Sequence, residues 1–147
     1  MNRKVINATS VSEDNITFKS KAEKRMYDLL KESGLEFEYE PNSITVAEGF
    51  YPKPWYKDLQ KIVRKVLPIR YTPDFIVKGR EFTYIIEVKG FEVEKYSMRR
   101  KLFLNRIRDR ENVIFFEVHT VKGMKFCIER IKELENEYTS GESQKPS

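Results

Sequence analysis

The sequence contains a single cysteine, Cys127, and a single histidine, His119. One cysteine cannot form a disulfide within the chain, and it fits a protein kept in a reducing compartment such as the cytoplasm. One histidine and one cysteine are too few ligands for a zinc site within one chain. They also supply little for a mechanism in which histidine activates a serine or cysteine nucleophile. Carboxylates, lysines and arginines are therefore the candidates for any chemistry.

Long apolar segments are also missing. No apolar run approaches the roughly 20 residues of a membrane span, and the first residues lack the apolar stretch of a secretory signal. Hydrophobic residues make up 39% of the 147 residues, which is enough for one folded domain with a real core. We expect this domain over residues 18–138, between a flexible arm at residues 1–17 and a disordered tail at residues 139–147.

Two strand-like segments carry the most informative residues. The first contains a Pro-Asp pair ending at Asp74, the second contains Glu87-Val88-Lys89, and a Gly-bearing connection near residue 80 joins them. This pattern predicts a β-hairpin in which Glu87 and Lys89 share one face and Asp74 lies across from Glu87. Such a patch suits a hydrolytic Mg²⁺ site, because carboxylate oxygens hold the cation and an ammonium can orient or deprotonate a water.

The net charge is +5, and the cations cluster in two segments, residues 57–70 and 94–110, that flank the predicted hairpin. Such a surface would attract a polyanion, whereas either segment alone is better explained as a solvated helix face. Because both flank the same acidic hairpin, we favour nucleic acid as the partner. The cations expected to contact it are Lys61, Arg64, Lys65, Lys95, Arg99, Arg100 and Lys101.

The remaining patterns predict an α/β domain with a mixed central β-sheet flanked by helices. Helices are expected over residues 20–33, 57–67, 94–110 and 126–138, and further strands over residues 35–40, 44–46 and 112–118. The second helix would make the segment at about residues 47–70 a basic helical insertion. Ser20 and Glu23, at the start of the first helix, match a capping box, in which the glutamate satisfies the N-cap amide.

Pro73-Asp74 followed by Glu87-Val88-Lys89 resembles the motif of the PD-(D/E)xK nuclease superfamily. That superfamily often carries a further acidic residue on the preceding helix, where Glu23 stands here. The segments 34–40, 71–75 and 87–91, in this order, are similar to those of small phage-type endonucleases, including Holliday-junction-resolving enzymes. The resemblance covers roughly residues 18–118, and implies a restriction-endonuclease-like core and, for a phage protein, the host cytoplasm.

The resemblance implies that Asp74, Glu87 and the Val88 carbonyl coordinate Mg²⁺, with Mn²⁺ as a substitute, and that Lys89 positions the attacking water. Glu23 would be a ligand of a second metal or only a helix cap, and both roles stay open. The implied enzyme is a Mg²⁺-dependent endodeoxyribonuclease from a phage or mobile element, structure-selective or site-specific. It would act on DNA as a homodimer or higher homo-oligomer and would not bind a membrane.

Segment 47–70 departs from the phage resolvases, in which the corresponding segment is short and swaps between subunits, so the mode of dimerisation stays open. Other functions also stay open: a homing or nicking endonuclease with sequence specificity, a module that only binds nucleic acid, and a structural subunit whose acidic hairpin pairs with its own arginines. The set Asp74, Glu87 and Lys89 argues against simple binding, because a binding module has no use for a costly carboxylate cluster.

Overall fold

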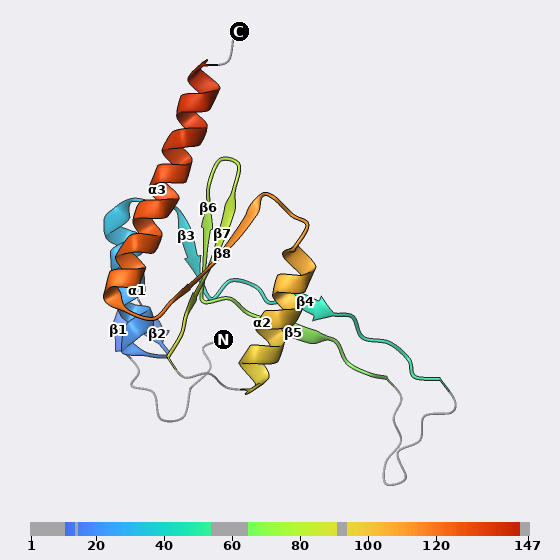
Figure 1. Cartoon of the computed structure of the whole chain (residues 1–147). Helices are drawn as coiled ribbons and strands as arrows, with labels where there is room; N and C mark the ends of the chain where they lie inside the picture. The colour runs from blue at the N-terminus through green and yellow to red at the C-terminus, as the bar shows by residue number, and fades with distance from the viewer. Residues whose placement is uncertain (1–10, 14, 54–64, 91–93, 145–147) are drawn as a thin grey trace. The chain divides into compact units, whose positions relative to one another are not determined.

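The structure is a computed structural model that describes residues 11–13, 15–53, 65–90 and 94–144 (Figure 1). Expectations that fall on other residues lie outside this description. They concern the start of the predicted arm, the end of the predicted tail, and most of the predicted helix at residues 57–67, including Lys61 and Arg64. Within the described ranges, no helix combines the length and apolar character needed to cross a membrane.

Two compact units make up the chain. Unit 1 takes its residues from Met1–Pro41, Pro73–Phe91 and Asn112–Ser147. Unit 2 takes its residues from Asn42–Thr72 and Glu92–Glu111. The chain therefore passes between the units several times, and one passage lies immediately before Asp74.

Unit 1 is built on a mixed sheet of four strands in the order β3-β6-β7-β8. Its strands are β3 (Phe37–Tyr39), β6 (Phe75–Lys78), β7 (Thr83–Val88) and β8 (Val113–Val118). The first three pair antiparallel, whereas β7 and β8 run parallel. The helices α1 (Lys21–Ser33) and α3 (Val121–Gln144) contact each other and the sheet (Figure 1). This arrangement confirms the predicted α/β class with a mixed central sheet.

Local signals set the ends of α1, as the sequence predicted. The Ser20 hydroxyl accepts a hydrogen bond from the Glu23 amide and caps the first turn. Gly34 ends the helix in the left-handed conformation, at φ 78, which costs glycine little. Met26 and Leu30, one turn apart, are fully buried, so the helix lays one apolar face on the core.

Side chains from the sheet, α1 and α3 form the core of unit 1. Its buried members are Phe18, Met26, Tyr27, Leu30, Phe75, Val77, Tyr84, Ile86, Val118, Met124, Cys127, Ile128 and Ile131. Phe18 belongs to a hairpin of β1 (Val11–Glu13) and β2 (Ile16–Phe18), which turns through Asn15 at φ 65. Apart from Phe18, the residues of this hairpin lie in the arm predicted to be flexible, residues 1–17. The fully buried Phe18 ring anchors them, which short-range patterning did not reveal.

The last helix is longer than predicted at both ends. It begins at Val121 and continues to Gln144, although the sequence predicted a helix over residues 126–138 and disorder from residue 139. Extending a helix adds one hydrogen bond per residue, whereas starting one is costly, so an anchored helix can continue into a polar segment. Ile131, near its middle, is fully buried and supplies such an anchor.

Unit 2 pairs β4 (Ile44–Ala47) with β5 (Ile69–Tyr71), and α2 (Glu94–Ile107) contacts both strands. The Tyr71 ring is 3% exposed and lies 5.0 Å from the Phe103 ring, which fixes the helix against β5. Beyond these strands, Phe50 and Val66 exchange backbone hydrogen bonds. Residues 65–67 are therefore not helical, which corrects the end of the predicted helix. The Val66 amide bonds to Phe50 rather than within a helical turn.

Candidate functional site

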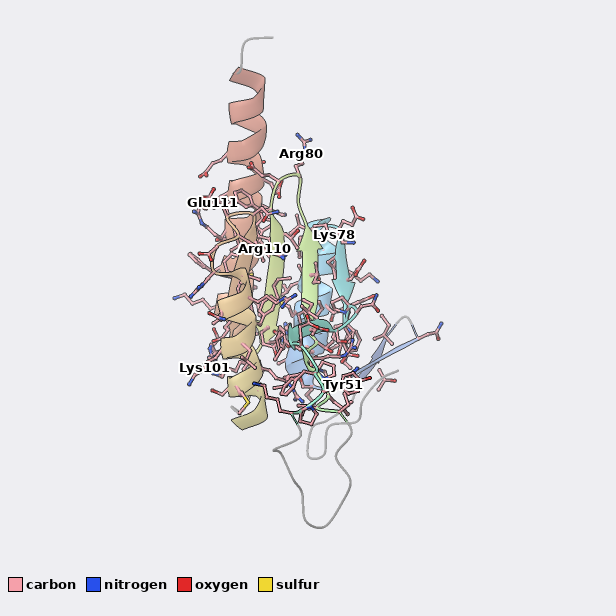
Figure 2. All side chains as sticks on the ribbon, turned by 90° about the vertical axis from the view of Figure 1, so that its right-hand side faces the viewer. Tyr51, Lys78, Arg80, Lys101, Arg110 and Glu111 are labelled. Atoms are coloured by element: carbon pink, nitrogen blue, oxygen red, sulfur yellow. The ribbon has the colours of Figure 1, made fainter. Side chains whose placement is uncertain are left out.

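The hairpin of β6 and β7 has the predicted register. Phe75 pairs with Ile86, and Arg80 lies at the tip of the connection (Figure 2). One further step along both strands brings Asp74 opposite Glu87, where cross-strand Cβ atoms are typically about 5 Å apart. Glu87 lies in β7 one residue before its end at Val88, and Lys89 follows the strand directly, with its amide bonded to the Val118 carbonyl. This register agrees with the predicted position of Asp74 across from Glu87.

Asp74 does not lie inside a strand, which corrects the continuous strand expected on both sides of it. The chain leaves β5 at Tyr71, passes through Pro73, and enters β6 at Phe75. Asp74 is 3% exposed, and its carboxylate Oδ2 accepts a 2.8 Å hydrogen bond from the Val88 amide. This bond ties Asp74 to the end of β7 that carries Glu87 and Lys89.

Lys19 provides the cation beside Asp74, although the sequence did not point to it. Its ammonium Nζ lies 3.3 Å from Asp74 Oδ1, 3.3 Å from Glu40 Oε1 and 3.6 Å from Glu23 Oε1. We call Glu23, Glu40 and Asp74 the carboxylate cluster; all of it, and Lys19, belongs to unit 1. Burial opposes the charged form of Lys19, but attraction to the three carboxylates outweighs it and raises the pKa of the ammonium.

Glu23 is buried in the same cluster, at 5% exposure. Its Oε1 accepts a hydrogen bond from the Tyr39 hydroxyl at 3.0 Å, and its Oε2 accepts one from the Ser20 hydroxyl at 3.2 Å. Burial, with repulsion from Asp74 second, raises the pKa of Glu23 to about 7. Burial also raises the pKa of Asp74, against the opposing effect of Lys19. At Ser20 the Glu23 carboxylate thus accepts from the hydroxyl, whereas the predicted capping box uses the amide, and the same carboxylate takes part in a polar network next to Asp74.

The stability of the metal-free protein should fall as pH rises from about 5 to about 8. The pKa of Glu23 is raised from 4.5 to about 7, so the folded state binds more protons than the unfolded state within this window. Glu23→Gln should make the stability depend less on pH. Part of the pH dependence should remain, because the pKa of Asp74 is also raised. Urea unfolding in EDTA at a series of pH values measures this. Glu32→Gln, at an exposed position on α1, is the control, and a wild-type slope in Glu23→Gln would contradict the prediction.

Glu40 was not predicted either, and its backbone is unusual. It adopts φ 48, a left-handed conformation that is uncommon and costly for a residue with a side chain. The Glu40 amide donates a 2.8 Å hydrogen bond to the Asp74 carbonyl, which holds this conformation. Apolar and acidic residues alternate along the strand predicted at residues 35–40, and this alternation predicts which side chains share a face. No local signal showed that the Glu40 side chain would turn toward Lys19.

The residues around Asp74 offer oxygen atoms to a divalent metal ion. Within the described part of the chain, no three His, Cys, Asp or Glu side chains are grouped at metal-ligating spacing. The donor chemistry nevertheless fits Mg²⁺, which prefers carboxylate and carbonyl oxygens. The ammonium of Lys19 already holds a positive charge 3.3 Å from Asp74 Oδ1. Asp74 Oδ1 thus already has one cation beside it, and the groups that the sequence motif assigns to a metal are Asp74, Glu87 and the Val88 carbonyl.

Most of the predicted nucleic-acid contacts that the structure describes belong to α2 in unit 2. Arg99 and Arg100 are half-buried, and the Arg100 guanidinium lies over the Tyr96 ring, 5.9 Å from its centroid. Lys101 is exposed and projects from the helix (Figure 2). Lys95 lies in the first turn of α2. Outside α2, Lys65 is exposed, with its ammonium 5.5 Å from the centroid of the Tyr51 ring.

Comparison with known proteins gives a family but no activity. No curated protein matches the chain. A family model described as "Protein of unknown function (DUF1064)" matches residues 3–126, and so includes the carboxylate cluster, the hairpin and α2. Because this match covers most of the sequence, the chain belongs to the DUF1064 family of proteins of unknown function.

Proposed function

We propose that the protein is a Mg²⁺-dependent endodeoxyribonuclease of the PD-(D/E)xK type. The observation that carries this proposal is the position of Asp74. Its carboxylate is buried and bonded to the backbone of β7, and the strand register continues to place Asp74 opposite Glu87. Burial raises the pKa of Asp74, and Lys19 is its specific charged partner; a titratable group perturbed in this way favours a functional site.

The chemistry follows from the residue types. Bound Mg²⁺ would stabilise the negative charge that develops on the phosphate oxygens during hydrolysis. Asp74 and Glu87 would supply the charged oxygens that hold the ion, and the Val88 carbonyl would supply a neutral one. Lys89 follows β7 directly, and its ammonium would orient a water for attack on the phosphorus.

DNA is the substrate that the charge distribution favours. The cations of α2, together with Lys65 and Arg70 of unit 2, provide a surface that attracts phosphates. Such contacts orient a nucleic acid without reading its sequence, which suits a structure-selective enzyme. One such site cuts one strand, so a homodimer would supply the second site needed to cut both strands of a junction or duplex.

The direct test is incubation of the purified protein with Mg²⁺ and a panel of substrates. Supercoiled plasmid, linear duplex, single-stranded DNA, a four-way junction and RNA would be compared by gel electrophoresis. We expect internal cleavage of DNA, with the preferred structure showing the substrate class, and no cleavage by Asp74→Asn prepared in parallel. Binding of DNA without cleavage of any substrate would instead support a module that only binds nucleic acid.

Replacing Arg99 and Arg100 with alanine should make DNA binding less sensitive to salt. Each phosphate contact changes the slope of log affinity against log salt by about 0.9, so the double variant should lose between about one and two units. The loss should be similar on every duplex sequence, because phosphate contacts carry no base information. Fluorescence anisotropy over a salt series measures the slope.

Arg106→Ala with Arg108→Ala is the matched control for this measurement. These cations already pair with Glu48 and Asp109, at 3.8 and 3.4 Å. Their loss should change the slope less than the loss of Arg99 and Arg100. An unchanged slope in the Arg99 and Arg100 variant would mean that this face of α2 is only solvated. The DNA path would then be sought near Lys65 and Arg70.

A further inference from the structure

Lys19 lies at the meeting point of three carboxylates from distant parts of unit 1. Glu23 is on α1, Glu40 follows β3, and Asp74 precedes β6, and each has an oxygen within 3.6 Å of the Lys19 Nζ atom. Asp74 is 55 positions from Lys19 in the sequence. Contacts of this range depend on the tertiary fold, so the ammonium has a specific place in the cluster.

The two oxygens of Asp74 have different partners. Oδ2 accepts the 2.8 Å bond from the Val88 amide, which belongs to the sheet backbone and is fixed. Oδ1 faces the Lys19 ammonium at 3.3 Å, and a lysine side chain can move because it has several rotatable bonds. Oδ1 is therefore the oxygen that a metal ion could take. Two cations close to one oxygen repel each other strongly in a partly buried site.

Glu40 gives Lys19 an alternative place. Its Oε1 is the same 3.3 Å from Nζ, and its side chain is 17% exposed, against 4% for Asp74. The left-handed backbone at φ 48 directs this carboxylate to Lys19 at a cost in conformational energy. An ammonium that leaves Asp74 can thus keep a partner at the more exposed side of the cluster.

We propose that Lys19 is an internal counter-ion that a divalent cation displaces from Asp74 when it binds. Before the metal arrives, Lys19 pairs with Asp74, Glu23 and Glu40 together and neutralises them; afterwards it gives up Asp74 and keeps its pair with Glu40. Lys19 is then a positioning residue that also weakens metal binding by competition. This inference rests on the proposed metal-dependent function and adds a regulatory residue to that site.

The test compares Ca²⁺ binding by calorimetry to the wild type, Lys19→Met and Lys24→Met, without DNA. Methionine keeps much of the aliphatic chain and removes the charge. Lys24 is the matched control: it lies on α1 and pairs with Asp28 at 2.7 Å. We expect Lys19→Met to bind Ca²⁺ about tenfold more tightly than the wild type, which corresponds to about 1.4 kcal/mol of lost competition. Lys24→Met should bind like the wild type.

The outcomes separate this inference from the proposed function. If Lys19→Met binds Ca²⁺ as tightly as the wild type or more weakly, the proposed displacement of Lys19 is wrong, whereas the proposed metal site is still supported. Absence of Ca²⁺, Mg²⁺ and Mn²⁺ binding by the wild type and by Lys19→Met overturns the metal-dependent function and the inference together.

A second measurement uses the wild type alone, in case Lys19→Met does not fold. Reductive methylation followed by peptide mass spectrometry reports how accessible each lysine amine is. Ca²⁺ should raise the labelling of Lys19 severalfold, because displacement releases its ammonium from Asp74, and should leave Lys24 unchanged. A purely structural counter-ion would stay in place, so unchanged or reduced labelling of Lys19 overturns the proposal.

Discussion

Replacing Asp74, Glu87 or Lys89 with alanine should lower DNA cleavage by at least about a hundredfold. In the proposed mechanism Asp74 and Glu87 would supply the charged oxygens for the metal and Lys89 would position the water, so each loss should remove stabilisation of the transition state. DNA affinity should stay within roughly tenfold, because the phosphate contacts are supplied by other residues. Single-turnover cleavage and anisotropy on the same DNA measure the two effects separately.

Controls for these variants must separate chemistry from folding. Asp74 is buried and paired with Lys19, and removing one partner of such a pair can cost about 3–5 kcal/mol. Asp74→Asn keeps the size of the side chain, and thermal unfolding would show whether each variant is folded. Asp28→Ala and Lys78→Ala remove charges from ion pairs elsewhere in unit 1 and should cut normally. Cleavage by folded Asp74→Asn at the wild-type rate would contradict the assignment.

Removing divalent ions should abolish cleavage, and Mg²⁺ or Mn²⁺ should restore it. The groups assigned to the metal are all oxygens, which suit these hard cations. Ca²⁺ should support DNA binding without cutting, because it takes more ligands in a looser geometry. Cleavage in excess EDTA, followed by titration with each ion, measures this. Undiminished cleavage in EDTA would exclude the metal mechanism, whereas loss of DNA binding alone would point to a structural role for the ion.

The local sequence determined the elements that carry the motif. Ser20 and Gly34 fixed the ends of α1, because a capping hydroxyl and a residue that tolerates positive φ act within one turn of the helix. The alternation of side chains and the short connection near Arg80 determined the register that brings Asp74 opposite Glu87. These features depend on neighbours in sequence, so periodicity and turn chemistry were sufficient to predict them.

Only the tertiary structure decided what surrounds that motif. The strand expected on both sides of Asp74 is divided because β5 pairs with β4 in unit 2, whereas β6 pairs with β3 in unit 1. Lys19 precedes α1, Glu40 follows β3 and Asp74 precedes β6, so these three residues meet only through the tertiary fold. Local periodicity identifies the face on which a side chain lies, but not which distant residue packs against it. The sequence alone therefore predicted the carboxylate motif, but it did not predict Lys19, the internal cation that pairs with the motif.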